Sequence, residues 1–209
     1  VTGVYRTLVR EAPRELAVWR NLMSLEGERV IAFAICFSGD LSETDEVLAP
    51  IHAIGKPVAD MLRDQPYVEV QSYLDEFEPR GLHYYWKTGY VAELGDALLD
   101  AELELFAECP IPDIEIGSLH IGGALNELPE DDGAVGNRDA RHVIGVNGMW
   151  EPDEPRADEF RDWIRTAFER LRPETTGRNY VNFQTADEDE QRVRETYGVN
   201  FERLVALKR

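Results

Sequence analysis

The sequence is poor in cysteine, in lysine and in long hydrophobic runs. Its 209 residues include two cysteines, which are too few for a disulfide framework and have no second Cys or His at zinc-ligand spacing. No apolar run approaches the ~18 residues of a membrane-spanning helix, and no basic segment followed by an apolar one indicates a secretory signal. We therefore expect no metal site, no membrane association and a cytoplasmic location.

Common catalytic motifs are also missing. No GxGxxG follows a predicted strand, and there is no phosphate-binding loop, no GxSxG and no HExxH. The four histidines do not pair at the spacing of helical metal ligands. Each histidine is therefore better explained as a surface or core residue than as a catalyst.

Acidic residues far outnumber basic ones. The chain has 41 Asp and Glu against 22 Lys and Arg, a net charge of −19, and three of the basic residues are lysines: Lys56, Lys87 and Lys208. Such a surface repels phosphates, so we expect no nucleic-acid partner. Many carboxylates with few lysines predict a halophilic protein, because concentrated salt screens self-repulsion. An ordinary acidic protein is the alternative, and unfolding measured against KCl separates the two.

Hydrophobic periodicity predicts one α+β domain over residues 1–209. The sheet is expected to be mostly antiparallel, with helices packed on one face, because hairpins and helices alternate without regular βαβ units. The predicted helices span 4–11, 43–54, 92–108, 154–171, 186–196 and 199–208. The predicted strands span 15–25, 29–38, 113–121, 140–150 and 178–184, with shorter ones near 57–63 and 124–128 and a strand or extended loop over 82–90. The apolar run 29–38 predicts a central strand, and a turn is expected around Glu26.

Two segments are candidates for a functional site. The first, HYYWKTGY (83–90), places Lys87 among aromatic residues, which suits a flat apolar ligand, although, taken alone, a core strand with an outward lysine fits better. The second is YVNF (180–183). On a strand, Tyr180 and Asn182 would share a face and present a phenol beside a carboxamide, with Val181 and Phe183 on the other face.

Several stretches resemble the C-terminal half of berberine-bridge-enzyme-like, FAD-linked oxidases. They are YWKTGY (85–90), HIGGA (120–124), NRDARHVIGVNGMW (137–150), RNYVNF (178–183) and ETYGVNFERLVALKR (195–209). The resemblance runs in order along nearly the whole chain. It implies a substrate-binding domain, with the FAD-binding domain and a final C-terminal segment lying outside these 209 residues. The chain also stops within a helical pattern, which is expected of a piece of a longer protein.

The resemblance assigns roles to individual residues. Tyr180 matches a tyrosine that is proposed to take the substrate's proton during hydride transfer to flavin. Asn182 matches an asparagine that positions the flavin or that tyrosine, and Trp86, Lys87 and Tyr90 match a strand that lines the substrate. If Lys87 faces the same cavity as Tyr180, its charge would lower the pKa of the phenol.

The expected function is therefore a part of an FAD-dependent oxidoreductase that oxidises an alcohol or a similar small organic substrate. FAD would be held mainly by the FAD-binding domain of the same polypeptide, and this fragment alone is not expected to be active. The alternative is a stand-alone small-molecule-binding domain of the same fold without catalysis.

Overall fold

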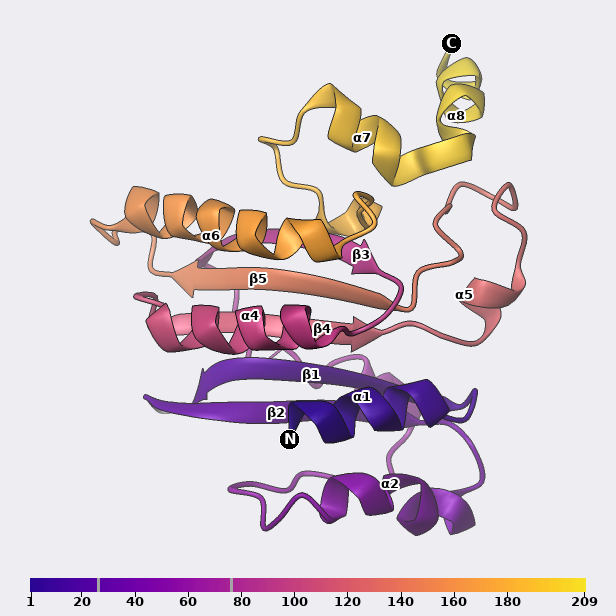
Figure 1. Ribbon diagram of the computed structural model, residues 1–209, viewed down its shortest axis with the longest axis vertical. Helices are drawn as coiled ribbons and strands as arrows, with labels where there is room; N and C mark the ends of the chain where they lie inside the picture. Colours follow the sequence, from indigo (N-terminus) through magenta and orange to yellow (C-terminus); the bar gives the residue numbers. More distant parts are fainter. Residues whose placement is uncertain (26, 76) are drawn as a thin grey trace.

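The computed structural model describes residues 1–25, 27–75 and 77–209 and is built on one five-stranded sheet. Every pair of neighbouring strands is antiparallel, in the order β2-β1-β4-β5-β3 (Figure 1). The strands are β1 (Leu16–Leu25), β2 (Glu28–Phe37), β3 (His83–Val91), β4 (Asp113–His120) and β5 (His142–Trp150). The helices are α1 (Thr2–Glu11), α2 (Thr44–His52), α3 (Tyr67–Val70), α4 (Asp96–Glu108), α5 (Ala124–Glu127), α6 (Ala157–Leu171), α7 (Glu190–Tyr197) and α8 (Phe201–Lys208).

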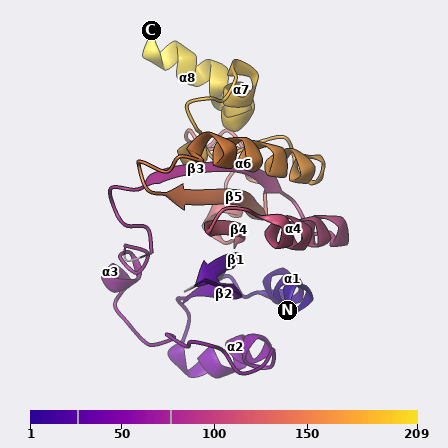
Figure 2. The same ribbon diagram turned by 90° about the vertical axis from the view of Figure 1, so that its left-hand side faces the viewer.

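Helices α1, α4 and α6 cover one face of this sheet. Seen along the sheet, these three helices lie on one side, whereas α3 and its flanking coil lie on the other (Figure 2). The buried residues of α6 recur at helical spacing, from Phe160 through Ile164 to Leu171, and meet the core residues of the strands. Each side chain that is fully buried in this way contributes about 1.5–3 kcal/mol. The predicted α+β architecture, with an antiparallel sheet and helices on one face, is confirmed.

A buried ion pair links the sheet to α4. The Arg20 guanidinium on β1 donates to the Glu102 carboxylate at 2.5 Å, and both side chains are fully buried. Burial raises the pKa of Glu102, while the adjacent Arg20 opposes that rise. The pair therefore places two compensating charges inside the apolar layer between sheet and helix.

Four sequence predictions of local structure were wrong. Residues 178–184 form no strand, 57–63 is irregular, and 124–128 contains the short helix α5. The strand predicted over 29–38 exists as β2 but lies at an edge of the sheet, where its residues are only half buried. The turn predicted at Glu26 falls partly outside the described residues.

Among the described residues, no helix is both long enough and apolar enough to cross a bilayer.

Candidate functional site

The face of the sheet opposite α1, α4 and α6, here called the open face, carries a regular grid of side chains. Strand register places Asn21, Gly117, Gly145 and Thr88 side by side across four strands. Side chains alternate along a strand, so these four residues face the same way. This central row forms part of a depression of about 140 Å³.

The two glycines make room for neighbouring side chains on the open face. A Cβ atom on Gly117 would collide with the side chains of Asn21 and Trp19, and one on Gly145 would lie 2.9 Å from Cγ2 of Thr88. Asn21 is only 9% exposed, and its Oδ1 atom has no hydrogen-bond partner among the described residues. A nearly buried acceptor thus lies against Gly117 without a hydrogen-bond partner among the described residues.

One end of the open face is apolar and is here called the tyrosine end, made of Tyr90, Leu119, Val143, Tyr180 and Phe183. These residues pack together beside the central row. Burial raises the pKa of Tyr90 to about 12, and the neighbouring Tyr180 adds to the effect. Tyr90 is therefore neutral across the physiological pH range.

The other end is here called the acidic end and consists of Glu78, Glu115, Asn147 and Trp86. Glu115, Asn147 and Trp86 are neighbours on β4, β5 and β3, and Glu78 lines the same depression. Burial raises the pKa of Glu115, and the charge of Glu78 raises it further. The Asn147 amide nitrogen lies 3.5 Å from the Glu115 carboxylate and is the one hydrogen-bond donor that the described residues offer to this carboxylate.

Tyr180 and Asn182 lie together, but not on a strand. Val181–Phe183 form a 3₁₀ turn, and across it the Asn182 side-chain amide donates to the Tyr180 hydroxyl oxygen at 2.7 Å. Phe183 is not turned away as the strand prediction required, because its ring packs edge-on against Tyr180 at 5.3 Å. The predicted phenol–carboxamide pair thus exists, and a turn rather than a strand creates it.

The turn is held by the edge strand β3. Thr176 donates its backbone N–H to the Tyr90 carbonyl, and the Tyr90 N–H donates to the Arg178 carbonyl, at 2.8 and 2.9 Å. The Trp86 indole N–H then donates to the Phe183 carbonyl at 2.9 Å. Two backbone hydrogen bonds are too few to form a strand. Together with the hydrogen bond from Trp86, they place Tyr180 over the open face.

Lys87 does not share this face. Its ammonium, with the side chain 11% exposed, donates to Thr185, Asp187 and Glu188 at 2.7, 2.8 and 3.0 Å. Burial opposes ionisation of Asp187, but hydrogen bonds from Lys87, Tyr85, Thr185 and Arg165 hold the pKa of that carboxyl well below its usual range. The expected effect of Lys87 on the pKa of Tyr180 required that the two side chains share a cavity. They do not share one. Trp86 and Tyr90 do lie on the open face, and their contact with substrate stays a prediction.

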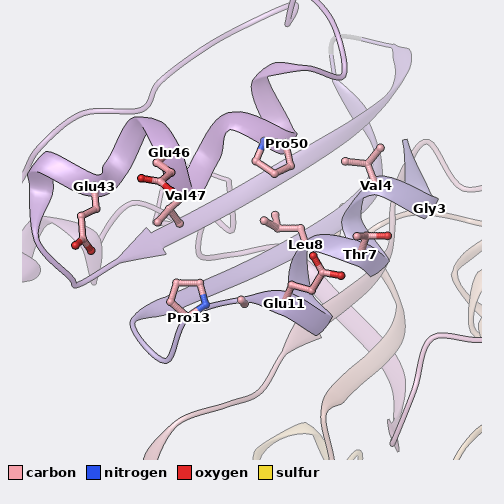
Figure 3. A pocket seen from close by; sticks show the side chains of 11 residues that line it. Gly3, Val4, Thr7, Leu8, Glu11, Pro13, Glu43, Glu46, Val47 and Pro50 are labelled. Atoms are coloured by element: carbon pink, nitrogen blue, oxygen red, sulfur yellow. The ribbon is translucent and has the colours of Figure 1, made fainter.

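A larger cavity of about 810 Å³ lies between α1 and α2 (Figure 3). Three carboxylates, of Glu11, Glu43 and Glu46, line it together with small and aliphatic residues. Of the described residues that line this cavity, none is aromatic or basic, and none belongs to the predicted site. We therefore place the candidate site on the open face, where an aromatic surface, unpartnered polar atoms and the Tyr180–Asn182 pair coincide.

Sequence reasoning missed Asn21, Glu115, Gly117 and Gly145. These residues are separated along the chain and meet only through the strand register. Only the pairing of β1, β4 and β5 brings these residues together, and a single sequence does not show which strands pair.

The chain is similar to known flavoenzymes. No family model matches it. It is 24% identical over 201 residues to an FAD-linked oxidoreductase of Dictyostelium discoideum, covering 95% of this chain and 42% of that protein. This relative agrees with the FAD-linked part of the sequence-based resemblance.

Solved structures share the fold. They include BBE-like 1 of Physcomitrella patens (TM-score 0.80, 15% identity), covering 99% of this chain and 46% of that one. Berberine bridge enzyme of Eschscholzia californica has a TM-score of 0.80 at 16% identity, with 99% and 48% covered. Aclacinomycin oxidoreductase has a TM-score of 0.74 at 18% identity, with 93% and 44% covered. The chain thus spans about half the length of these proteins.

Proposed function

We propose that this chain is the substrate-binding part of an FAD-dependent oxidoreductase. The open face would lie toward the flavin and the substrate, with Tyr180 accepting a proton from the substrate. The observation that carries the proposal is the Tyr180–Asn182 hydrogen bond over the tyrosine end of the face that α1, α4 and α6 leave uncovered. The FAD-linked relative supports the choice of cofactor.

The residues of the open face fit a flat aromatic group. Gly117 and Gly145 let the side chains of Asn21 and Thr88 pack against the sheet at the floor of the depression. Trp19, Leu119, Val143 and Phe183 line the depression with apolar surface, and the Asn21 acceptor is free. Asn182 would contact the flavin or orient Tyr180, as its position beside the phenol allows.

When bound, FAD supplies the hydride acceptor. Oxidation of an alcohol to a carbonyl also releases the hydroxyl proton, which in this proposal passes to the Tyr180 oxygen. The Asn182 amide already donates to that oxygen, and a hydrogen bond to the charged form stabilises a phenolate. Trp86, Tyr90 and Phe183 would exclude water from the reacting atoms.

FAD would be held mainly by a separate FAD-binding domain of the same polypeptide. Neither cysteine of this chain is assigned a covalent link to flavin. Burial raises the pKa of the Cys109 thiol to about 11, and that thiol lies in the helix-covered core. In this proposal, the 209-residue fragment alone has no oxidase activity.

The test is Tyr180→Phe in the flavin-containing full-length protein. Loss of a general base should slow anaerobic flavin reduction by an alcohol substrate by roughly 10²–10⁴. Tyr197→Phe, on α7, is the matched control and should reduce flavin at the wild-type rate. An undiminished rate in Tyr180→Phe would refute the role of the phenol.

The mass of the native polypeptide tests the domain arrangement. We expect a denatured mass well above the 23.8 kDa of this chain. We also expect the native protein to carry flavin. A native mass equal to that of this chain, without flavin, would replace the oxidoreductase with a stand-alone binding domain.

A further inference from the structure

The acidic end of the open face carries negative charge that the described residues do not neutralise. Neither Glu115 nor Glu78 forms an ion pair within the parts of the chain that the structure describes, although eighteen such pairs occur elsewhere. The two carboxylates are close enough for Glu78 to raise the pKa of Glu115. Glu115 is half buried and Glu78 is exposed, and a like charge beside a half-buried carboxylate is unfavourable unless a cation lies nearby.

The groups around these carboxylates suit an organic cation. Trp86, Tyr84 and Trp19 line the same depression, and aromatic faces attract cations through their quadrupoles. Among the described residues, the side chains that line it include no Lys, Arg or His. These residues therefore leave the negative charge at this end for a bound cation to neutralise.

Unpartnered amide oxygens provide an independent indication. Asn21, nine-tenths buried, and Asn147, half buried, both line the depression, and the Oδ1 atom of each lacks a hydrogen-bond partner among the described residues. A ligand that carries N–H or O–H groups could satisfy these acceptors. A primary ammonium has three donors and no acceptor, which matches a site made of carboxylates and amide oxygens.

We propose that the acidic end binds a protonated primary amine of the substrate. This inference rests on the proposed function, because the other part of the same substrate would react at the tyrosine end. Glu115 and Leu119 are four residues apart on β4, so the two ends are separated by about 13 Å along the strand. The substrate is thus an aromatic or alicyclic alcohol with an amine at the far end of the molecule.

The experiment compares phenethylamine, which is cationic at neutral pH, with the neutral 2-phenylethanol. Titration calorimetry on the full chain in low salt should show the amine binding on the order of tenfold more tightly than the alcohol, because charge-assisted hydrogen bonds are the stronger ones. Salt should weaken amine binding and leave alcohol binding unchanged.

The variants separate the local effect from net charge. Glu115→Gln should remove the preference for the amine and leave alcohol binding unchanged, with Glu78→Gln causing a smaller loss. Glu93→Gln is the matched control, because it removes one exposed carboxylate beyond the end of β3. Equal binding of the two probes to the wild-type chain, or equal effects of Glu115→Gln and Glu93→Gln, would overturn the proposal.

This outcome does not depend on flavin chemistry. If Tyr180→Phe reduces flavin normally but the amine preference persists, the proposed catalytic role fails and the cation site stands. If the preference is absent but Tyr180→Phe is slow, the cation site fails and the catalytic role stands. Glu78→Gln keeps the proposal testable if Glu115→Gln does not fold, because equal effects of Glu78→Gln and Glu93→Gln on amine binding would also overturn it.

Discussion

Alternate residues of β3 face opposite surroundings. Tyr85, Lys87 and Val91 point toward α6 and the segment before α7, where they join the core or the ion pairs with Asp187. Trp86 and Tyr90 point to the open face, where they meet the turn that carries Tyr180. A single strand therefore contributes both to the stability of the fold and to the candidate site.

The same division holds on β1. Arg20 is fully buried against Glu102 on the helix-covered face, whereas its neighbour Asn21 keeps a free acceptor on the open face. On the helix side, two buried cations, Arg20 and Lys87, have carboxylate partners within the protein. On the open side, the carboxylates of Glu78 and Glu115 have none among the described residues. The two faces thus differ in how their charges are paired, and the proposed ligand site lies on the face whose carboxylates have no partner among the described residues.

The largest expected effect on stability is at Glu102. Glu102→Gln leaves the Arg20 guanidinium buried without a counter-ion, so the free energy of unfolding should fall by about 3–5 kcal/mol. Urea unfolding at neutral pH measures it.

Asp100→Asn provides the matched control on the exposed side of α4 and should change the stability little. If Glu102→Gln is no less stable than Asp100→Asn, the helix-covered face does not depend on internal charge pairing, and the contrast between the two faces weakens.

A smaller effect is expected from acid at His142, also on the helix-covered face. Burial, with smaller contributions from the charges of His120, Arg20 and Arg141, lowers the pKa of His142 to about 3. The unfolded chain, with a histidine pKa near 6.5, binds more protons between these two values, so stability falls as pH drops from about 6.5 to 3. At pH 4.5 the His142 share of this loss should be about 2–3 kcal/mol.

The measurement is urea unfolding of the wild type and His142→Gln from pH 7 to pH 4. The variant should lose less stability over this range than the wild type, although carboxylates contribute to acid unfolding of both. His83→Gln, at an exposed histidine, should follow the wild-type curve. Parallel curves for wild type and His142→Gln would show that His142 is protonated in the folded protein without penalty.

The sequence predicted the layers of the fold because periodicity reports which side of an element is buried. The apolar residues of α4 and α6 predicted the helices that cover the sheet, and the alternation over 113–121 predicted β4. Periodicity does not report strand order, so the apolar run of β2 predicted a central strand although β2 lies at an edge. Its half-buried residues pack against the core from one side only.

The sequence predicted less of the candidate site than of the fold. Tyr180 and Asn182 were found as a pair, but the turn that joins them depends on hydrogen bonds from Tyr90 and Trp86, which are distant in sequence. The alternation of β3 also separates Lys87 from Trp86, and a cluster of aromatic residues around a lysine does not reveal which of them share a face. Contacts between distant segments therefore determine which of these side chains share a face, and local sequence patterns do not show it.

The smallest expected effect on stability is at Lys87, and it tests the division of β3 directly. Lys87→Met removes the ammonium that joins Thr185, Asp187 and Glu188, so the free energy of unfolding should fall by about 1–2 kcal/mol. Hydrogen exchange of the amides of residues 178–188 should accelerate, since this segment carries Tyr180 and is anchored to β3 through the lysine.

Binding of 2-phenylethanol to the open face should stay unchanged in Lys87→Met, because the lysine lies on the opposite side of the strand. Lys56→Met, at an exposed lysine, is the matched control and should alter neither exchange nor binding. If Lys87→Met instead weakened probe binding while exchange of 178–188 stayed at the wild-type rate, Lys87 would be the substrate contact that the sequence suggested. The division of β3 into a stabilising side and a ligand-binding side would then be wrong.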